Sequence, residues 1–211
     1  AIQEFEDRLT RLQDGMRKLD IDIAFFTAES EFRYFTGFFT QFWQSPTRPW
    51  FLLVPSVGKP VAVIPVIGAE CMRRTFVDDI RTWDSPADDD RGIALLCEAI
   101  VELAGAGARI GLPQGRETLL RMPLSDFDAV KNRLPNCRFD DVAQLVLTLR
   151  MVKSEAEIGK IRHVCRAVSR AFGKVPQNIR AGMSEREAFQ AFKILCLEEG
   201  VDDVSYLVGG A

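Results

Sequence analysis

The sequence predicts an α/β domain whose mixed sheet is flanked by helices, followed by a shorter, mainly helical region. Over about the first 140 residues, short apolar runs of strand length alternate with longer amphipathic segments, which is the pattern of an α/β domain. Two of these runs are joined by the turn Pro55–Lys59, so at least part of the sheet is antiparallel. Two capping boxes, beginning at Ser154 and Ser184, then start helices after the last strand expected in the sheet.

Each element of the first domain is expected from its own local pattern. Apolar residues at helical spacing predict a first helix over Ile2–Leu19, with one buried face made of Phe5, Leu9, Leu12, Met16 and Leu19. Ser30 is expected to cap a short helix that runs through Tyr34 and ends near Gly37. The remaining expected elements are the strands Ile21–Phe26, Trp50–Val54, Val61–Val66, Ile80–Trp83, Arg109–Leu112 and Cys137–Phe139, and the helices Gly68–Thr75, Ile93–Ala104 and Leu124–Leu134.

A second region begins around Leu149. Its first helix follows the capping box at Ser154 and gathers apolar residues on one side, namely Ile158, Ile161, Cys165, Val168 and Phe172. Its second helix follows Ser184 and is expected to run through Glu198, with Gly200 just beyond its end. Val204–Val208 is then expected as a strand, and Gly209-Gly210 as a turn.

Such a strand needs a partner strand, and two helices with one strand enclose no core. We therefore expect the 211 residues to be part of a longer protein. The alternative is that these helices dock on the first domain.

The composition argues against several function classes. A net charge of −3 without a basic run gives no reason to expect nucleic acid binding. Five scattered cysteines, without a CxxC pair, argue against a disulfide framework and against structural zinc. The chain has neither a signal peptide nor an apolar run of about 18 residues, so we expect a cytoplasmic protein without a membrane contact.

The passage Phe32–Pro55 is the most unusual part of the chain. Nine of the chain's twenty aromatic residues lie between Phe32 and Phe51. The two arginines of the passage, Arg33 and Arg48, are expected to have no acidic residue near them, because the next one after Glu31 is Glu70. Aromatic surface beside an uncompensated guanidinium is a common way to bind a small anionic or zwitterionic ligand. The alternative is that the rings are core and that Arg48 pairs with a distant acid.

The chain offers no self-sufficient catalytic constellation. It lacks the glycine-rich phosphate motifs, the nucleophile elbow and the HExxH zinc motif. Its one histidine, His163, falls on the polar side of an expected helix, where a solvated residue is the ordinary case. The chain also contains four acidic groups, and aspartate at such positions is ordinarily explained by its preference for turns and helix caps. The groups are Asp78-Asp79, Asp88-Asp89-Asp90, Asp140-Asp141 and Asp202-Asp203. No catalytic residue and no metal ligand is therefore assigned.

Four motifs occur in register along the chain. They are YFTGF at Tyr34–Phe38, Arg48-Pro49 before an apolar strand, the R-x-V-K-S-x-x-E-I pattern of Arg150–Ile158, and the helix start Gly182–Glu185. Together they resemble the creatinase/prolidase/aminopeptidase P family of metallohydrolases. The resemblance implies that residues 1–148 are the family's N-terminal domain. It also implies that residues 149–211 are the first helices and strand of its catalytic, α+β "pita-bread" domain, which is incomplete here.

The resemblance also implies a chemistry for the intact protein. It implies hydrolysis of Xaa-Pro bonds in small peptides, by an Xaa-Pro dipeptidase or aminopeptidase P that forms a homodimer. The family's ligands, two Asp, one His and two Glu, hold two divalent ions (Mn, Zn or Co) and match no position of this chain. The segment is therefore expected to bind no metal and to be inactive by itself.

A role for the aromatic passage follows from the same resemblance. In creatinase-like members, an Arg near the position of Arg48 binds the substrate carboxylate. Arg48 is thus a candidate substrate-binding residue, with Phe42, Trp43 and Trp50 as candidate walls of the pocket.

Two other functions stay open. The long insert Thr40–Pro46 would enclose a small zwitterion through cation–π contact, which suits a creatinase-like amidinohydrolase or a dimethylsulfoniopropionate lyase. The family fold could also be retained without metals, as a peptide- or protein-binding module. The family's metal ligands, if they follow Ala211, would favour the enzymes.

Overall fold

The computed structural model describes residues 2–45, 48–87 and 90–208. The chain forms two compact units, Ala1–Met151 and Val152–Ala211. The sheet lies in the first unit, and the described part of the second unit contains two helices. No helix within the described ranges is both long and apolar enough to cross a membrane.

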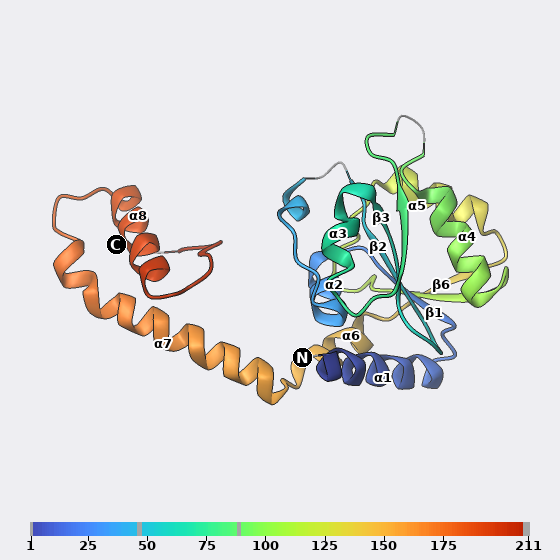
Figure 1. The fold of residues 1–211 in the computed structure, drawn as a ribbon, viewed down its shortest axis with the longest axis horizontal. Coiled ribbons are helices and arrows are strands. Elements are labelled where there is room, and N and C mark those ends of the chain that lie inside the picture. Colours follow the sequence, from blue (N-terminus) through green and yellow to red (C-terminus); the bar gives the residue numbers. More distant parts are fainter. Residues whose placement is uncertain (1, 46–47, 88–89, 209–211) are drawn as a thin grey trace. The chain divides into compact units, whose positions relative to one another are not determined.

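The first unit is built on a mixed sheet (Figure 1). The strands of its described residues are β1 (Ile23–Phe26), β2 (Phe51–Pro55), β3 (Val61–Pro65), β4 (Asp79–Trp83), β5 (Arg109–Leu112) and β6 (Arg138–Asp141). Their order across the sheet is β4-β3-β2-β1-β5-β6. Strand β2 runs antiparallel to β1 and β3, and the other neighbours are parallel, so β2 opposes the direction of all the others. This confirms the mixed sheet and the hairpin expected from the sequence.

Helices cover both faces of this sheet (Figure 1). They are α1 (Ile2–Lys18), α2 (Glu29–Thr36), α3 (Ala69–Met72), α4 (Ile93–Ala104), α5 (Leu124–Arg133) and α6 (Ala143–Met151), with the 3-10 turns η1 (Gln41–Gln44) and η2 (Val66–Gly68). Helices α1, α2, α3 and α6 contribute to one apolar cluster, and α4 and α5 contribute to a second cluster on the opposite face.

The strands alternate between these two clusters. In β1, Ala24 and Phe26 belong to the first cluster, and Ile23 and Phe25 belong to the second. Strands β2 and β3 follow the same rule, and every residue of these three strands is buried. A strand that is buried on both faces has a continuous apolar sequence, which is why these strands were predictable.

Two local expectations on the first unit are wrong. Leu19 is 46% exposed because α1 ends at Lys18, so the buried face of this helix stops at Met16. Ser30 does not cap α2, whose N-cap position is Ala28 without a side-chain hydrogen bond. Helix α6 has no counterpart among the sequence-based expectations, although it buries Ala143, Val146 and Leu149.

Helix α2 ends at Gly37, as expected, and two constraints require glycine there. Gly37 has a φ of +74°, and its amide donates a hydrogen bond to the carbonyl of Arg33 at 3.0 Å. A Cβ atom at this position would also lie 2.7 Å from the ring of Phe5 on α1. The glycine of the YFTGF motif therefore closes the helix and lets α1 approach it.

The second unit contains α7 (Glu155–Asn178) and α8 (Glu185–Glu198) in its described part. Both helices begin with complete capping boxes, at Ser154 and Ser184, which confirms the sequence-based expectation. The two helices pack through a small apolar cluster that includes Ala171, Phe192, Leu195 and Cys196.

Two other features of this unit differ from the expected ones. Residues 201–208 form neither helix nor strand, so the strand expected over Val204–Val208 is wrong. The turn expected at Gly209-Gly210 lies outside the described residues. On the apolar side expected for α7, Ile161 and Phe172 stay 46% and 59% exposed.

Candidate functional site

One edge of the sheet gathers the polar residues of interest. The carboxyl ends of β1, β3, β4, β5 and β6 lie at this edge, together with the amino end of β2. Open α/β sheets bind their ligands outside the carboxyl ends of the strands. Thr27 follows β1, Ser85 follows β4, Arg121 lies in the connection after β5, and Arg48 precedes β2. Hydrogen bonds join these four segments to one another.

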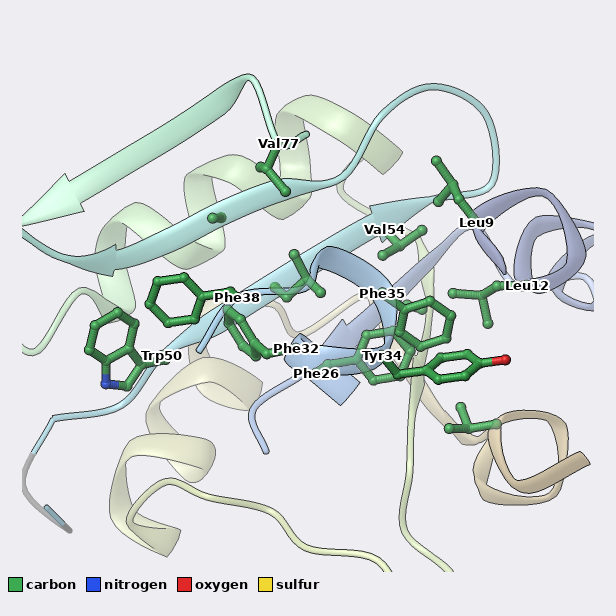
Figure 2. Packing of buried hydrophobic residues seen from close by; sticks show 14 of the residues in the cluster. Leu9, Leu12, Phe26, Phe32, Tyr34, Phe35, Phe38, Trp50, Val54 and Val77 are labelled. Atoms are coloured by element: carbon green, nitrogen blue, oxygen red, sulfur yellow. The ribbon is translucent and has the colours of Figure 1, made fainter. Parts of the chain in front are cut away.

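Most rings of the aromatic passage belong to the core. Phe32, Phe38 and Trp50 are at most 1% exposed, and Trp43 is 8% exposed. The Trp50 ring centre lies 5.3 Å from that of Phe38 and 5.6 Å from that of Trp43. Figure 2 shows Phe38 and Trp50 side by side at one end of this cluster, with Phe32 nearby. The structure therefore places these rings in the core, and a ligand role for Trp43 and Trp50 stays a prediction.

The 3-10 turn η1 separates the two aromatic residues of the insert. Thr40 precedes this turn, and its Oγ1 accepts a hydrogen bond from the amide of Phe42 at 3.2 Å. Trp43 packs edge-on against Phe32, with ring centres 5.1 Å apart. Phe42 stays half-buried and can be reached from solvent. We call Thr40–Ser45 together with Arg48 the Arg48 loop.

Arg48 has an oriented guanidinium group without an acidic partner in the described part of the chain. Its Nε donates a hydrogen bond to Ser85 Oγ at 2.8 Å, and its Cζ lies 5.9 Å from the ring centre of Phe42. Within the described residues, no carboxylate pairs with Arg48, and its two terminal nitrogens donate no hydrogen bond. The alternative that Arg48 pairs with a distant acid therefore gains no support from the described part of the chain.

Arg33 has an acidic partner in the structure, a difference from Arg48 that the sequence analysis did not predict. Arg33 Nη1 lies 3.2 Å from Glu29 Oε1, one helical turn earlier in α2, and its Cζ lies 4.7 Å from the ring centre of Phe39. The expectation that Arg33 lacks an acidic neighbour is thus wrong, because the helix brings the i and i+4 residues together.

Arg121 is a residue of this site that sequence reasoning missed. Its Nη1 donates to the carbonyl of Arg48 at 3.0 Å, and its Nη2 contacts the carbonyls of Trp43 at 3.2 Å, Phe42 at 3.3 Å and Ser45. Its Cζ lies 5.2 Å from the ring centre of Trp43. No local signal marks such a residue, because its partners are backbone atoms more than seventy positions away.

Burial lowers the pKa of Arg121, and the charge of Glu29 opposes this shift. Arginine has a very high reference pKa, so the guanidinium group remains charged at neutral pH. Its charge faces carbonyl dipoles of the Arg48 loop rather than a carboxylate partner among the described residues. Two half-buried guanidinium groups, those of Arg48 and Arg121, therefore lie close together at this edge.

The described residues contain no metal site. No three His, Cys, Asp or Glu side chains among them come together closely enough to hold an ion. Asp79 pairs with Arg81 at 2.9 Å, and Asp140 pairs with Arg109 at 3.0 Å, so both have structural partners. Asp78 pairs with Lys59, and Asp90 and Asp141 accept hydrogen bonds from backbone amides. His163, Asp202 and Asp203 are exposed, and Asp88 and Asp89 lie outside the described residues.

This arrangement can bind and orient a ligand, and it supplies no group for bond cleavage. A guanidinium group with free terminal nitrogens can accept a carboxylate in a two-point contact. Ser85 and Phe42 hold it from two sides. The four predicted site residues do lie together: Arg48 contacts Phe42, and Trp43 contacts Trp50 behind them.

The sequence of this chain is similar to those of known proteins. The family model of the creatinase/prolidase N-terminal domain matches residues 8–152. A creatinase from Bacillus sp. (strain B-0618) is 31% identical over 188 residues, which cover 88% of this chain and 43% of the creatinase. A probable dipeptidase PepE from Mycobacterium tuberculosis is 26% identical over 163 residues, covering 76% of this chain and 40% of the relative.

Solved structures show the same fold. A prolidase from Thermococcus sibiricus has a TM-score of 0.82 at 22% identity, covering 96% of this chain and 52% of that protein. The dipeptidase PepE from Mycobacterium ulcerans has a TM-score of 0.74 at 20% identity, covering 98% and 52%. The chain thus spans about half the length of each of these four relatives.

Proposed function

The chain belongs to the creatinase/prolidase N-terminal domain family, and on this premise we propose that the intact protein is a hydrolase of the Xaa-Pro dipeptidase or aminopeptidase P type. Within it, residues 1–148 would be the N-terminal domain and residues 149–211 the beginning of the catalytic pita-bread domain. The dipeptidase names among the relatives and the prolidase folds among the structural neighbours support this proposal.

The observation that carries the proposal is the geometry of Arg48. A dipeptide substrate ends in a carboxylate, and Arg48 has two terminal nitrogens without a partner among the described residues, at the edge where open α/β sheets bind ligands. Ser85 accepts the Nε hydrogen bond, which leaves the end-on pair formed by the two terminal nitrogens for a ligand. Arg48 would bind the substrate carboxylate, and Phe42 would lie against the substrate.

We assign the metal chemistry to the intact protein and not to this segment. Two divalent ions (Mn, Zn or Co) are proposed for the enzyme, where they would activate water for hydrolysis. The described residues do not fit such a centre, because they contain no cluster of ligands. The segment by itself would accordingly be inactive, and its part would be to bind and orient the substrate.

Two further properties belong to the same proposal. The intact protein would form a homodimer, as members of this family do. It would act in the cytoplasm, where all five cysteines, which are free in the structure, would stay reduced.

A second candidate is an enzyme acting on a small zwitterion. The creatinase shares more identity with this chain than the dipeptidase does, 31% against 26%. Phe42 beside Arg48 would suit a ligand that carries both charges, since a ring face attracts a cation and a guanidinium group attracts an anion. A creatinase-like amidinohydrolase and a dimethylsulfoniopropionate lyase both take such substrates. A metal-free peptide-binding module is the third candidate.

A combined metal and activity measurement on the full-length protein tests the proposal. The purified protein would be analysed for bound transition metals and then assayed on Ala-Pro, on Ala-Ala as the matched control, on creatine and on dimethylsulfoniopropionate. We expect about two metal ions per chain and cleavage of Ala-Pro that a chelator abolishes. Residues 1–211 alone serve as the inactive control.

Each other result selects a different function. Turnover of creatine or dimethylsulfoniopropionate without cleavage of Ala-Pro would replace the dipeptidase by the second candidate. A metal-free full-length protein that binds Ala-Pro without cleaving it would support the binding module.

A further inference from the structure

We propose that Arg121 is the positioning residue of the substrate site: it fixes the Arg48 loop and, through the carbonyl of Arg48, sets where the Arg48 guanidinium group is presented. The substrate consequence rests on the proposed function. Arg121 would not touch the substrate, because its own nitrogens are engaged with the loop backbone.

Arg121 contacts the backbone of the Arg48 loop both before and after residues 46–47 in the sequence. On one side its Nη2 binds the carbonyls of Phe42, Trp43 and Ser45, and on the other its Nη1 binds the carbonyl of Arg48 at 3.0 Å. A guanidinium group is planar and carries donors at fixed angles, so these contacts define an orientation as well as a distance. The ammonium group of a lysine lacks this geometry.

Arg121 is itself anchored to the sheet. Its amide donates a hydrogen bond to Thr27 Oγ1 at 2.8 Å, and Thr27 is a buried residue directly after β1. Arg121 follows β5, which pairs with β1, so this bond spans the point where the strand order changes direction. Arg121 thus connects the loop to the rigid part of the fold through both its side chain and its backbone.

Other contacts of the described loop residues also help to hold this position. Trp43 packs in the core, but Thr40, Gln41 and Gln44 are half-buried or exposed. Arg48 adds the bond from its Nε to Ser85 at 2.8 Å. Removing the Arg121 side chain would take a donor away from the carbonyls of Trp43 and Arg48, and the loop would move to hydrate them. The carbonyl of Phe42 would keep its hydrogen bond from the amide of Ser45 at 3.0 Å.

The test compares Arg121→Ala with Arg121→Lys and with Arg116→Ala in the full-length protein. Arg116 is a matched control, because it is exposed in the same connection and its side chain forms no hydrogen bond or ion pair with another described residue. Two readouts are measured: amide hydrogen exchange in peptides covering residues 40–45, and KM and kcat for Ala-Pro.

For Arg121→Ala we expect faster exchange confined to residues 40–45, and a KM raised about 10- to 100-fold with a smaller change in kcat. Arg121→Lys should give an exchange rate and a KM between those of Arg121→Ala and the wild type, because an ammonium group can replace only some of the guanidinium hydrogen bonds. Arg116→Ala should match the wild type in both readouts.

Unchanged exchange in Arg121→Ala would overturn the proposal, and so would faster exchange with an unchanged KM. If Arg121→Ala fails to fold, Arg121→Lys decides, and wild-type exchange and KM in that variant would overturn the proposal. A wild-type protein that cleaves no Ala-Pro would overturn the proposed function alone, because the exchange measurement would still show whether Arg121 holds the loop.

Discussion

The rings at Phe32–Phe38 and at Trp50 are held by apolar burial, whereas the Arg48 loop between them is held by hydrogen bonds to its backbone. Trp50 is fully buried within the cluster shown in Figure 2. Arg48 is half-buried and keeps two nitrogens without a protein partner among the described residues. The two parts are adjacent in sequence and differ in what fixes them.

Because of this difference, substitutions in the two parts should affect different properties, either the stability of the fold or the binding of a ligand. Substitutions among the core rings should lower the free energy of unfolding and change ligand binding only through the fold. Substitutions in the polar part of the loop should change binding and leave the fold nearly as stable as before. Trp43 belongs to both parts, since its ring lies in the core and its carbonyl contacts Arg121.

The largest effect is expected for Trp50→Ala. The substitution leaves a cavity beside Phe38 and Trp43 in the core, and should lower the free energy of unfolding by about 3–5 kcal/mol. Urea denaturation of residues 1–211 measures this loss. Phe39→Ala is the control in the same passage; Phe39 is 59% exposed, so the change should stay within about 0.5 kcal/mol. Equal losses in both variants would remove the distinction between core and surface rings.

Trp43→Ala should have the next largest effect, about 3 kcal/mol, at the lower end of the range for a buried aromatic side chain. Its ring packs on Phe32 and Trp50 but retains an exposed fraction of 8%. Thermal unfolding followed by circular dichroism measures the loss. An unchanged melting temperature would instead place Trp43 with the binding part of the loop.

Gly37→Ala should cost about 1–2 kcal/mol, because alanine is strained at a positive φ and its Cβ would crowd Phe5. Gly107→Ala is the matched control, since a Cβ there meets no atom within 4 Å. Urea denaturation of both variants gives the comparison. A Gly37→Ala protein as stable as the Gly107→Ala protein would show that the α1–α2 contact is not a constraint.

Much of the first unit was predictable because its signals are local. Helix α4 (Ile93–Ala104) and strand β5 (Arg109–Leu112) have the bounds expected from the sequence, since each combines a compact apolar run with turn residues at its ends. Helix α6 was missed because its sequence shows no clear apolar stripe. Its buried residues are Ala143, Val146 and Leu149, but some of the exposed and half-buried residues between and after them are also apolar.

Features that depend on distant partners were not predictable. Residues 204–208 have the composition of a strand, but a strand forms only when its backbone can hydrogen-bond to a neighbouring strand. In the described structure these residues form no strand. The helices α7 and α8 were predictable from their capping boxes, whereas the exposed fractions of Ile161 and Phe172 depend on what packs against them. Arg121 binds carbonyl groups, which carry no sequence signal.

The central claim is that Arg48 serves a ligand while the buried rings of Trp43 and Trp50 serve the fold, and one measurement tests it most directly. The kcat/KM for Ala-Pro would be compared between Arg48→Ala and Arg33→Ala in the full-length protein, since Arg33 lies in the same passage and pairs with Glu29. We expect Arg48→Ala to lose about 1.5–3 kcal/mol of transition-state stabilisation with an unchanged melting temperature, and Arg33→Ala to retain wild-type kinetics. Unchanged kinetics in Arg48→Ala, or an equal loss in both variants, would contradict the claim.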